Sequence, residues 1–205
     1  MTKYFWDERY NQEEFVYGIQ PNEYLKEKLS GRDTGKILFV AEGEGRNAVY
    51  AAKLGWEVIA FDQSEIGKRK ALQWAEKNDV SIDYRISDAE FFPLEETSFD
   101  AVAMIYSHFP NEKRKEIHRR ISKALKPGGI LILEGFSKEH SRNQKDNPTA
   151  GGPRNPEMLW DLEELKSDFE GFDFLEAKIE NVNLNEGNSH KGKASVVRIF
   201  AVKSD

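Results

Sequence analysis

A glycine-rich loop and an acidic residue at a fixed distance from it have a direct chemical interpretation. Gly43, Gly45 and Ala48 satisfy the pattern G-x-G-x-x-G/A, and Asp62 lies nineteen residues after Gly43. Glycines let the backbone approach a ligand closely, and a carboxylate at this distance can accept hydrogen bonds from both hydroxyls of a ribose. The spacing therefore predicts a site for a ribonucleotide-type cofactor.

The charge of this loop discriminates between cofactors. Glu42 and Glu44 flank Gly43, so a pyrophosphate would meet like charge where a helix N-terminus ordinarily attracts anions. S-adenosylmethionine has no phosphate, and it carries a cationic ammonium and a cationic sulfonium beside one carboxylate. The loop therefore favours S-adenosylmethionine, with S-adenosylhomocysteine as its product. An NAD-dependent oxidoreductase is the less favoured alternative.

S-adenosylmethionine is a donor of methyl groups, and transfer of its methyl group needs a general base only when the nucleophile arrives protonated. Two of the four histidines are candidates for that base. His108 follows a predicted strand at the sheet edge where ligands bind in α/β folds. His190 lies in the predicted loop between the last two strands, which returns to that edge if the preceding strand is parallel. His118 falls inside a predicted helix and His140 in a polar loop, so both are expected at the solvated surface.

Aromatic residues precede the predicted core. Trp6, Tyr10 and Tyr17 accompany Arg9 there, and an aromatic face can stabilise a sulfonium by cation–π contact. Trp6 is therefore a candidate cofactor contact, and the alternative is that it fastens the N-terminal segment to the domain. The polar segment 136–155 has no periodicity. We predict that it and the N-terminal stretch form a mobile lid over the substrate pocket.

The pattern of apolar residues predicts the strands and helices that must position the candidate site residues. Short apolar runs predict strands at 36–41, 56–61, 81–86, 99–106 and 130–134, which alternate with predicted helices at 47–54, 64–77 and 111–125. A helix is predicted over 21–29 and another from Asn155 to Phe169, followed by a hairpin of strands 172–180 and 194–202. This order predicts an α/β, doubly wound (Rossmann-like), seven-stranded, mostly parallel sheet with an antiparallel last strand and helices on both faces.

Composition excludes several classes of protein. The 205 residues have a net charge of −6, which disfavours nucleic-acid binding. Because the chain has no cysteine, thiolate metal sites and thiol relays are excluded, and no metal site is predicted. No signal core or apolar span is visible, so we expect a cytoplasmic protein without membrane contact. We expect one domain over 1–205, with an N-terminal helical segment (1–35), a cofactor-binding core (36–135) and a substrate loop, helix and hairpin (136–205).

Five segments carry a family resemblance: ILFVAEGEGRNA, VIAFDQS, SDAEFFPL, FDAVAMIYSHF and LKPGGILILE. Together they resemble the class I S-adenosylmethionine-dependent methyltransferases, over about 36–134. The chain looks closest to the small branch that includes tellurite-resistance-type and thiopurine-type methyltransferases. WDERY (6–10), GGP (151–153) and HKGKASVV (190–197) are similar to a bacterial subgroup of that branch.

The resemblance implies a role for each matching position. Gly43 and Gly45 would face the methionine part of the cofactor, Asp62 would bind the ribose hydroxyls, and Gln63 would lie against the adenine. The remaining implied contacts are at the adenine edge and beside the cofactor: Asp88, Ala89, Tyr106, Ser107 and, within the glycine loop, Asn47.

Two positions depart from the family pattern. Phe39 stands where the family usually has an acidic residue, and Ala41 stands where it usually has a glycine. The ammonium group of the cofactor therefore lacks its usual partner, and we expect Glu42 or Glu44 to replace it.

The sequence predicts an S-adenosylmethionine-dependent methyltransferase that acts on a small molecule. Because the sulfonium is already activated, positioning supplies much of the catalysis. The family's motif for amino-methylating enzymes, N/D-P-P-aromatic, is replaced by Ser107-His108-Phe109-Pro110, which disfavours methylation of bases or glutamine. A non-catalytic module that binds S-adenosylmethionine or S-adenosylhomocysteine is the alternative from another class.

Overall fold

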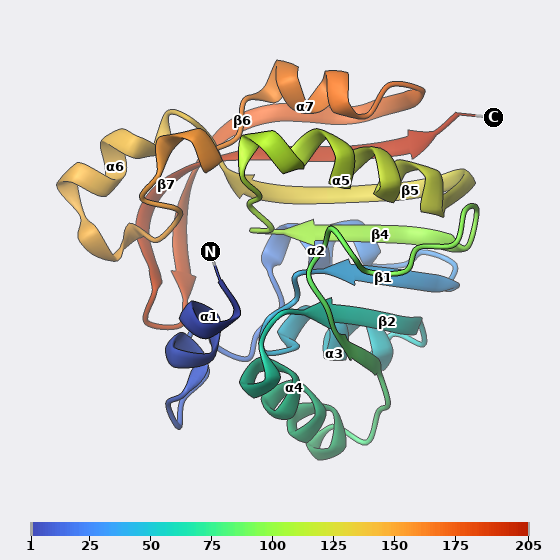
Figure 1. Cartoon of the computed structure of the whole chain (residues 1–205), viewed down its shortest axis with the longest axis horizontal. Coiled ribbons are helices and arrows are strands. Elements are labelled where there is room, and N and C mark those ends of the chain that lie inside the picture. The colour runs from blue at the N-terminus through green and yellow to red at the C-terminus, as the bar shows by residue number, and fades with distance from the viewer. Residues whose placement is uncertain (1, 205) are drawn as a thin grey trace.

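The computed structural model describes residues 2–204, with the backbone alone for Pro148. Its centre is a seven-stranded sheet in the order β3-β2-β1-β4-β5-β7-β6 (Figure 1). Among these strands, β7 runs opposite to the other six and pairs antiparallel with β5 and β6. The predicted fold class is therefore confirmed. The strands are β1 (Lys36–Val40), β2 (Glu57–Asp62), β3 (Asp83–Ile86), β4 (Phe99–Ile105), β5 (Leu125–Phe136), β6 (Phe172–Glu186) and β7 (His190–Lys203).

Helices cover both faces of the sheet, because the central strands present apolar side chains alternately to each face. In β1, Leu38 and Val40 join one core cluster, while Ile37 and Phe39 join the other. The first cluster is covered by α5 (Asn111–Ala124) and α7 (Leu162–Asp168). The second is covered by α2 (Glu23–Leu29), α3 (Arg46–Lys53) and α4 (Glu65–Lys77). The buried position of Phe39 explains how an apolar residue replaces the expected acid there.

The terminal hairpin is longer than the pattern predicted. Strands β6 and β7 pair up to Glu186 and His190, with one shift of register between Phe174 and Glu176, and residues 187–189 form the loop. The prediction that His190 lies in the loop is therefore wrong, because His190 is the first residue of β7. The part of the hairpin beyond the predicted strands is rich in asparagine. It pairs through backbone hydrogen bonds, and its sequence has no apolar run from which strands could be predicted. The distal hairpin lies beside α1 (Lys3–Tyr10), at the carboxyl ends of the parallel strands (Figure 1).

The segment 136–155 is more structured than predicted. It contains α6 (His140–Asp146) and a 3₁₀ turn, Pro148–Ala150. The single helix predicted after Asn155 is also wrong, because a 3₁₀ turn (Pro156–Met158) is separated from α7. The break has a tertiary cause: the Trp160 side chain is fully buried and the Trp160 backbone N–H donates to the carbonyl of Phe136, which holds the chain extended. Asp161 then caps α7.

The N-terminal segment is fastened to the core by a buried lysine. The Lys70 ammonium, on α4, donates to the backbone carbonyls of Gln12 and Glu14 at 3.0 and 2.6 Å. It also forms an ion pair with Glu44 in the glycine loop. One side chain thus joins the segment after α1, the glycine loop and α4. Within residues 2–204, the structure has no helix with the length and apolar character needed to cross a membrane.

Candidate active site

A cavity of about 730 Å³ opens at the carboxyl ends of β1, β2 and β4. Its wall combines the ends of these strands with α1, the residues around Gly151 and the hairpin loop. Most of the predicted site residues line it: Trp6, Glu42, Asn47, Asp62, Gln63, Asp88, Ala89, Tyr106, Ser107, His108 and His190. Residues from both termini and the centre of the chain therefore share one chamber.

Glu42 is the acidic residue of the glycine loop that faces this cavity. Its carboxylate accepts hydrogen bonds from the backbone N–H groups of Asn47 (2.9 Å) and Ala48 (2.8 Å), at the start of α3. Burial raises the pKa of Glu42 to about 7, in spite of these hydrogen bonds. A cation placed beside this carboxylate would favour its ionised form.

Asp62 ends β2 and lines the cavity with a second carboxylate, which is buried. One oxygen accepts from the Gly43 N–H (3.1 Å) and the other from the Ser64 N–H (2.9 Å). Burial raises the pKa of Asp62 to about 6. Each carboxylate oxygen has a second lone pair, so the side chain is held in position and can still accept hydrogen bonds from a ligand.

Three predicted loop contacts lie outside the cavity wall. The face of Gly43 is covered by Tyr10, since an added Cβ would lie 2.6 Å from the tyrosine oxygen. Gly45 permits α3 to approach α4, where an added Cβ would lie 2.5 Å from that of Ala71. The Glu44 carboxylate is turned toward Lys70 and the Val16 N–H. Of the two glutamates considered for the ammonium, Glu42 is thus the one that faces the cavity.

Two left-handed residues occur where strands enter the site. Ala41 follows β1 with φ of 53°, and Tyr106 follows β4 with φ of 55°. This region is unfavourable for residues with a Cβ. The backbone at Ala41 therefore explains why glycine is usual at that position in the family that the sequence resembles. The Tyr106 hydroxyl donates to Glu134 at 3.0 Å, which holds the ring against the cavity.

His108 lines the cavity but has no free ring nitrogen. Its Nδ1 lies 2.8 Å from the carbonyl of Met158, and its Nε2 accepts from the Phe136 N–H at 3.1 Å. Burial lowers the pKa of His108 to about 3. With both nitrogens bonded to the backbone, His108 joins β5 to the 3₁₀ turn before Leu159, and this geometry does not favour it as a general base.

The prediction that His118 and His140 lie at the surface is wrong, because both are fully buried. His118 Nδ1 lies 2.9 Å from the Asp168 carboxylate of α7. The His140 ring stacks on Phe136, with centroids 4.3 Å apart. The position of His118 inside a helix and the polar neighbours of His140 predicted that both side chains would be exposed. Packing between elements that are distant in the sequence buries them instead.

His190 has the geometry that His108 lacks. Its Nδ1 lies 3.2 Å from a Glu186 oxygen, and its ring packs between Tyr17 (4.4 Å) and Tyr106 (4.5 Å). Burial lowers the pKa of His190 below its ordinary value, and Glu186 opposes that shift. The ring is therefore neutral near pH 7. Its Nε2 has no hydrogen-bond partner in the part of the chain that the structure describes.

The partners of His190 form a polar network that the sequence did not reveal. Glu186 pairs with Arg46 at 2.9 Å and accepts a hydrogen bond from Asn22 at 3.0 Å. Although burial opposes it, the Arg46 charge holds the pKa of Glu186 at about 2. Asn22 also donates to Glu134 at 2.6 Å. These residues come from sequence positions up to 164 apart, so no local spacing could identify them.

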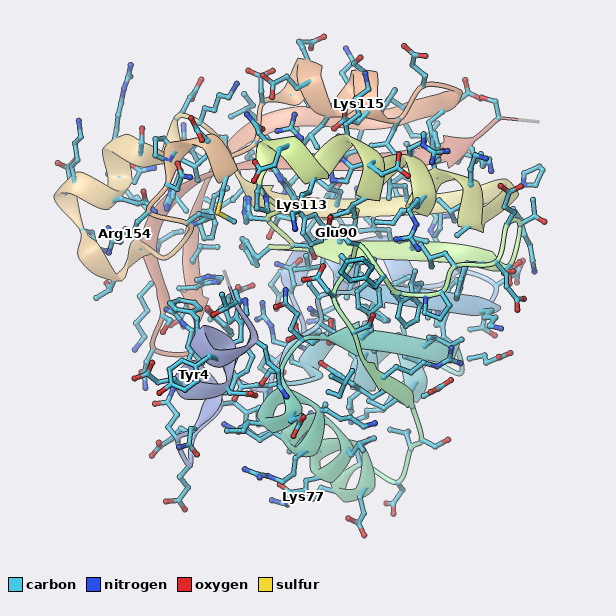
Figure 2. The ribbon with its side chains drawn as sticks, in the orientation of Figure 1. Tyr4, Lys77, Glu90, Lys113, Lys115 and Arg154 are labelled. Atoms are coloured by element: carbon cyan, nitrogen blue, oxygen red, sulfur yellow. The ribbon has the colours of Figure 1, made fainter. Side chains whose placement is uncertain are left out.

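Cations also line the cavity. Lys113 forms an ion pair with Glu90 beside the wall, and both are labelled in Figure 2. Arg154, labelled near α6 in the same figure, belongs to the wall as well. Among the described residues, no group of three or more histidine or acidic side chains is arranged to hold a metal ion.

The chain is similar in sequence to known methyltransferases. Residues 37–129 match the family model described as a methyltransferase domain. The chain is 32% identical over 107 residues to a demethylmenaquinone methyltransferase of Renibacterium salmoninarum, a match that covers 50% of this chain and 41% of the relative. It is 29% identical over 121 residues to methyltransferase GfsG of Streptomyces halstedii, covering 57% and 43%. The chain thus spans less than half the length of these curated relatives.

Solved structures share the fold over nearly the whole chain. A structure described as "Conversion of a Disulfide Bond into a Thioacetal Group during Echinomycin Biosynthesis" has a TM-score of 0.78 at 18% identity, covering 98% of this chain and 92% of that one. TehB from Haemophilus influenzae has a TM-score of 0.73 at 18% identity, covering 98% and 67%. At this level of identity, the likeness concerns the fold.

Proposed function

We propose that this chain, whose residues 37–129 match the model of a methyltransferase domain, transfers a methyl group from S-adenosylmethionine to a small-molecule acceptor. The observation that carries the proposal is the polarity of the cavity. Two carboxylates, those of half-buried Glu42 and buried Asp62, lie at the strand ends, and a neutral histidine with one free nitrogen lies in the same wall.

The residues at the strand ends suit each part of the cofactor. Asp62 would accept hydrogen bonds from the ribose hydroxyls, and Gln63, Asp88 and Ala89 would contact the adenosine. Glu42 would pair with the ammonium group. Bound S-adenosylmethionine supplies a methyl group on a positively charged sulfur. The acidic strand ends favour this cation and would repel the pyrophosphate of NAD.

Trp6 and the glycine-loop residues have separate roles in this proposal. The Trp6 ring stacks on Tyr10 at 5.5 Å and lines the cavity, where its face can stabilise positive charge. Gly43 would act through its backbone, since its N–H fixes Asp62. Asn47, Tyr106 and Ser107 complete the wall around the cofactor.

His190 is the general base that this geometry favours. Its Nδ1–H donates to Glu186, so Nε2 is left as the acceptor for a proton from the methyl acceptor. When that proton arrives, the Glu186 carboxylate at 3.2 Å would stabilise the imidazolium. The proton moves from the nucleophile to Nε2 as the new bond to the methyl carbon forms. The electron pair of the broken sulfur–methyl bond would stay with the leaving S-adenosylhomocysteine.

Methyl transfer from labelled S-adenosylmethionine to a panel of small acceptors tests this function. We expect activity that His190→Gln reduces by roughly a hundredfold, in line with the loss of a general base, without weakening S-adenosylhomocysteine binding. Glu186→Gln should move the pH dependence of the rate. Tight binding without transfer to any acceptor would favour the alternative of a non-catalytic binding module. Tight NAD binding would favour an oxidoreductase.

We also propose membership of the branch with tellurite-resistance-type and thiopurine-type enzymes. The motifs that suggest this branch converge in space: Trp6, Gly151, Pro153 and His190 all line the one cavity. Gly151 leaves room for His190, because an added Cβ would lie 2.4 Å from its ring. The acceptor panel should therefore include aromatic thiols and metalloid oxyanions. Exclusive use of amines would argue against this placement.

A further inference from the structure

The guanidinium group of Arg9 lines the cavity without an acidic partner. Arg9 comes from the last turn of α1. Its Nε is buried, and no hydrogen-bond acceptor reaches it from any residue that the structure describes. Its guanidinium carbon lies 5.7, 6.0 and 5.8 Å from the ring centroids of Phe5, Trp6 and Tyr17. These rings hold the positive charge in place but give its N–H donors no oxygen acceptor.

Three acidic side chains of this region already have other partners within the protein. Glu186 pairs with Arg46, Glu44 pairs with Lys70, and Asp62 accepts from two backbone N–H groups. Arg46 shows the contrast, because it lines the same cavity but is satisfied by Glu186 and by the carbonyls of Tyr17 and Gln20. A buried guanidinium donor without an acceptor is unfavourable, unless a ligand supplies the oxygen.

We propose that Arg9 is a carboxylate-binding residue, and that the ligand in the cavity presents a carboxylate to its guanidinium group while its organic part packs on Trp6 and Tyr17. The guanidinium fork matches the two oxygens of a carboxylate. Tyr17 also contacts His190, so this anion lies near the proposed base. The inference rests on the proposed function for the ligand's identity: the carboxylate belongs either to the methionine part of the cofactor or to an acidic methyl acceptor.

Calorimetry on the full chain distinguishes these two sources. S-adenosylhomocysteine has the carboxylate, whereas 5′-deoxy-5′-methylthioadenosine lacks it. If the cofactor presents the carboxylate, Arg9→Met weakens S-adenosylhomocysteine binding by roughly ten- to a hundredfold and changes 5′-deoxy-5′-methylthioadenosine binding less than twofold. Arg9→Lys should restore part of the affinity. The control is Arg69→Met, at an exposed arginine of α4, with no effect expected.

If the acceptor presents the carboxylate, Arg9→Met leaves both nucleosides unaffected. Benzoate, titrated with and without saturating S-adenosylhomocysteine, then binds wild type at least tenfold better than benzamide, and Arg9→Met abolishes that preference. The proposal is overturned if neither arm shows an Arg9-dependent preference for the carboxylate-bearing ligand, or if Arg9→Met weakens both nucleosides equally. Failure of wild type to bind either nucleoside would contradict the proposed function. The titrations of benzoate and benzamide into wild type and Arg9→Met would still test whether Arg9 binds a carboxylate.

Discussion

Asp62 is held by two backbone N–H groups at the end of β2, with its remaining lone pairs toward the cavity. We expect Asp62→Ala to weaken S-adenosylhomocysteine binding by roughly ten- to a hundredfold, because the ribose hydroxyls lose a charged acceptor. Calorimetry measures the change. Asp83→Ala, at an exposed carboxylate of the neighbouring strand, is the control. Unchanged affinity in a folded Asp62→Ala protein would count against the ribose assignment.

Glu42 should couple cofactor binding to proton release. Its pKa is about 7 in the ligand-free protein, and an ammonium beside it would lower that pKa. S-adenosylhomocysteine should therefore bind more tightly as pH rises from 5.5 to 8, with protons released near pH 6.5. Titration in two buffers of different ionisation enthalpy measures the release. Asp62, with a pKa of about 6, adds to the effect in the same direction.

The variant Glu42→Gln isolates this group. It should bind S-adenosylhomocysteine more weakly at pH 8 and release fewer protons at pH 6.5.

The same pKa affects the stability of the ligand-free fold. Because the folded pKa of Glu42 lies above its ordinary value of 4.5, the contribution of Glu42 to the free energy of unfolding is complete below pH 4.5 and is lost as pH rises to about 7. Urea unfolding should thus show wild type losing stability relative to the variant over that window. If wild type and Glu42→Gln release the same number of protons on binding, Glu42 is not the residue that pairs with the ammonium group.

At the level of elements, the turn from β1 into the glycine loop stores backbone strain at Ala41. Its φ of 53° costs about 1–2 kcal/mol for a residue with a Cβ. Glycine relieves this cost but loses about 0.5–1 kcal/mol through its freer unfolded state. We expect Ala41→Gly to stabilise the protein by about 0.5–1 kcal/mol in urea unfolding.

The matched control for that prediction is Ala103→Gly, in the regular and buried part of β4. There glycine gains no conformational advantage and removes a packed methyl group, so a loss of about 1 kcal/mol or more is expected. Equal destabilisation by the two substitutions would show that the Ala41 backbone carries no strain.

The hairpin is the element that completes the site. Its extended arms bring Glu186 and His190 opposite each other in the β6–β7 ladder, and both face Arg46 at the start of α3. A hairpin that ended where its apolar pattern ends would leave the cavity without its proposed base. Its polar distal residues are therefore better understood as part of the site than as a surface loop.

At the scale of the whole molecule, the predicted lid consists of segments that lie over one opening. Trp6 and Tyr10 of α1 line the cavity on one side, and the residues from Gly151 to Asn155 line another part of the wall. We expect amide hydrogen exchange in 3–10 and 140–155 to slow when S-adenosylhomocysteine binds, because the ligand stabilises the closed arrangement.

Buried residues of α5, such as Ile121 and Ala124, provide the reference for that experiment, since they belong to the first core cluster and do not line the cavity. Their exchange should change little. If neither lid segment gains protection on binding, the lid hypothesis fails. The variant Lys70→Met removes the bonds to the carbonyls of Gln12 and Glu14 and the ion pair with Glu44, so it should speed exchange in the N-terminal segment and in the glycine loop.

The sequence by itself determined the class of the sheet, the parallel direction of its central strands and the strand-end residues that line the cavity. These features depend on local relations: apolar runs mark buried strands, and Gly43 and Asp62 are related by one strand–helix–strand unit. Neighbouring parallel strands then end at the same edge, so Asp62, Asp88 and Tyr106 meet without further information. The departure at Ala41 was visible in the sequence, and its left-handed backbone gives the reason.

Only the tertiary structure decided which side chains face the cavity and which are buried elsewhere. Glu42 and Glu44 are two residues apart, yet Lys70 draws Glu44 away and leaves Glu42 at the cavity wall. His108 and His190 looked equivalent as candidates, but backbone groups of Met158 and Phe136 occupy both nitrogens of His108. Such outcomes depend on partners distant in the chain. The direction and surroundings of a side chain are set by packing between elements, which no local spacing encodes.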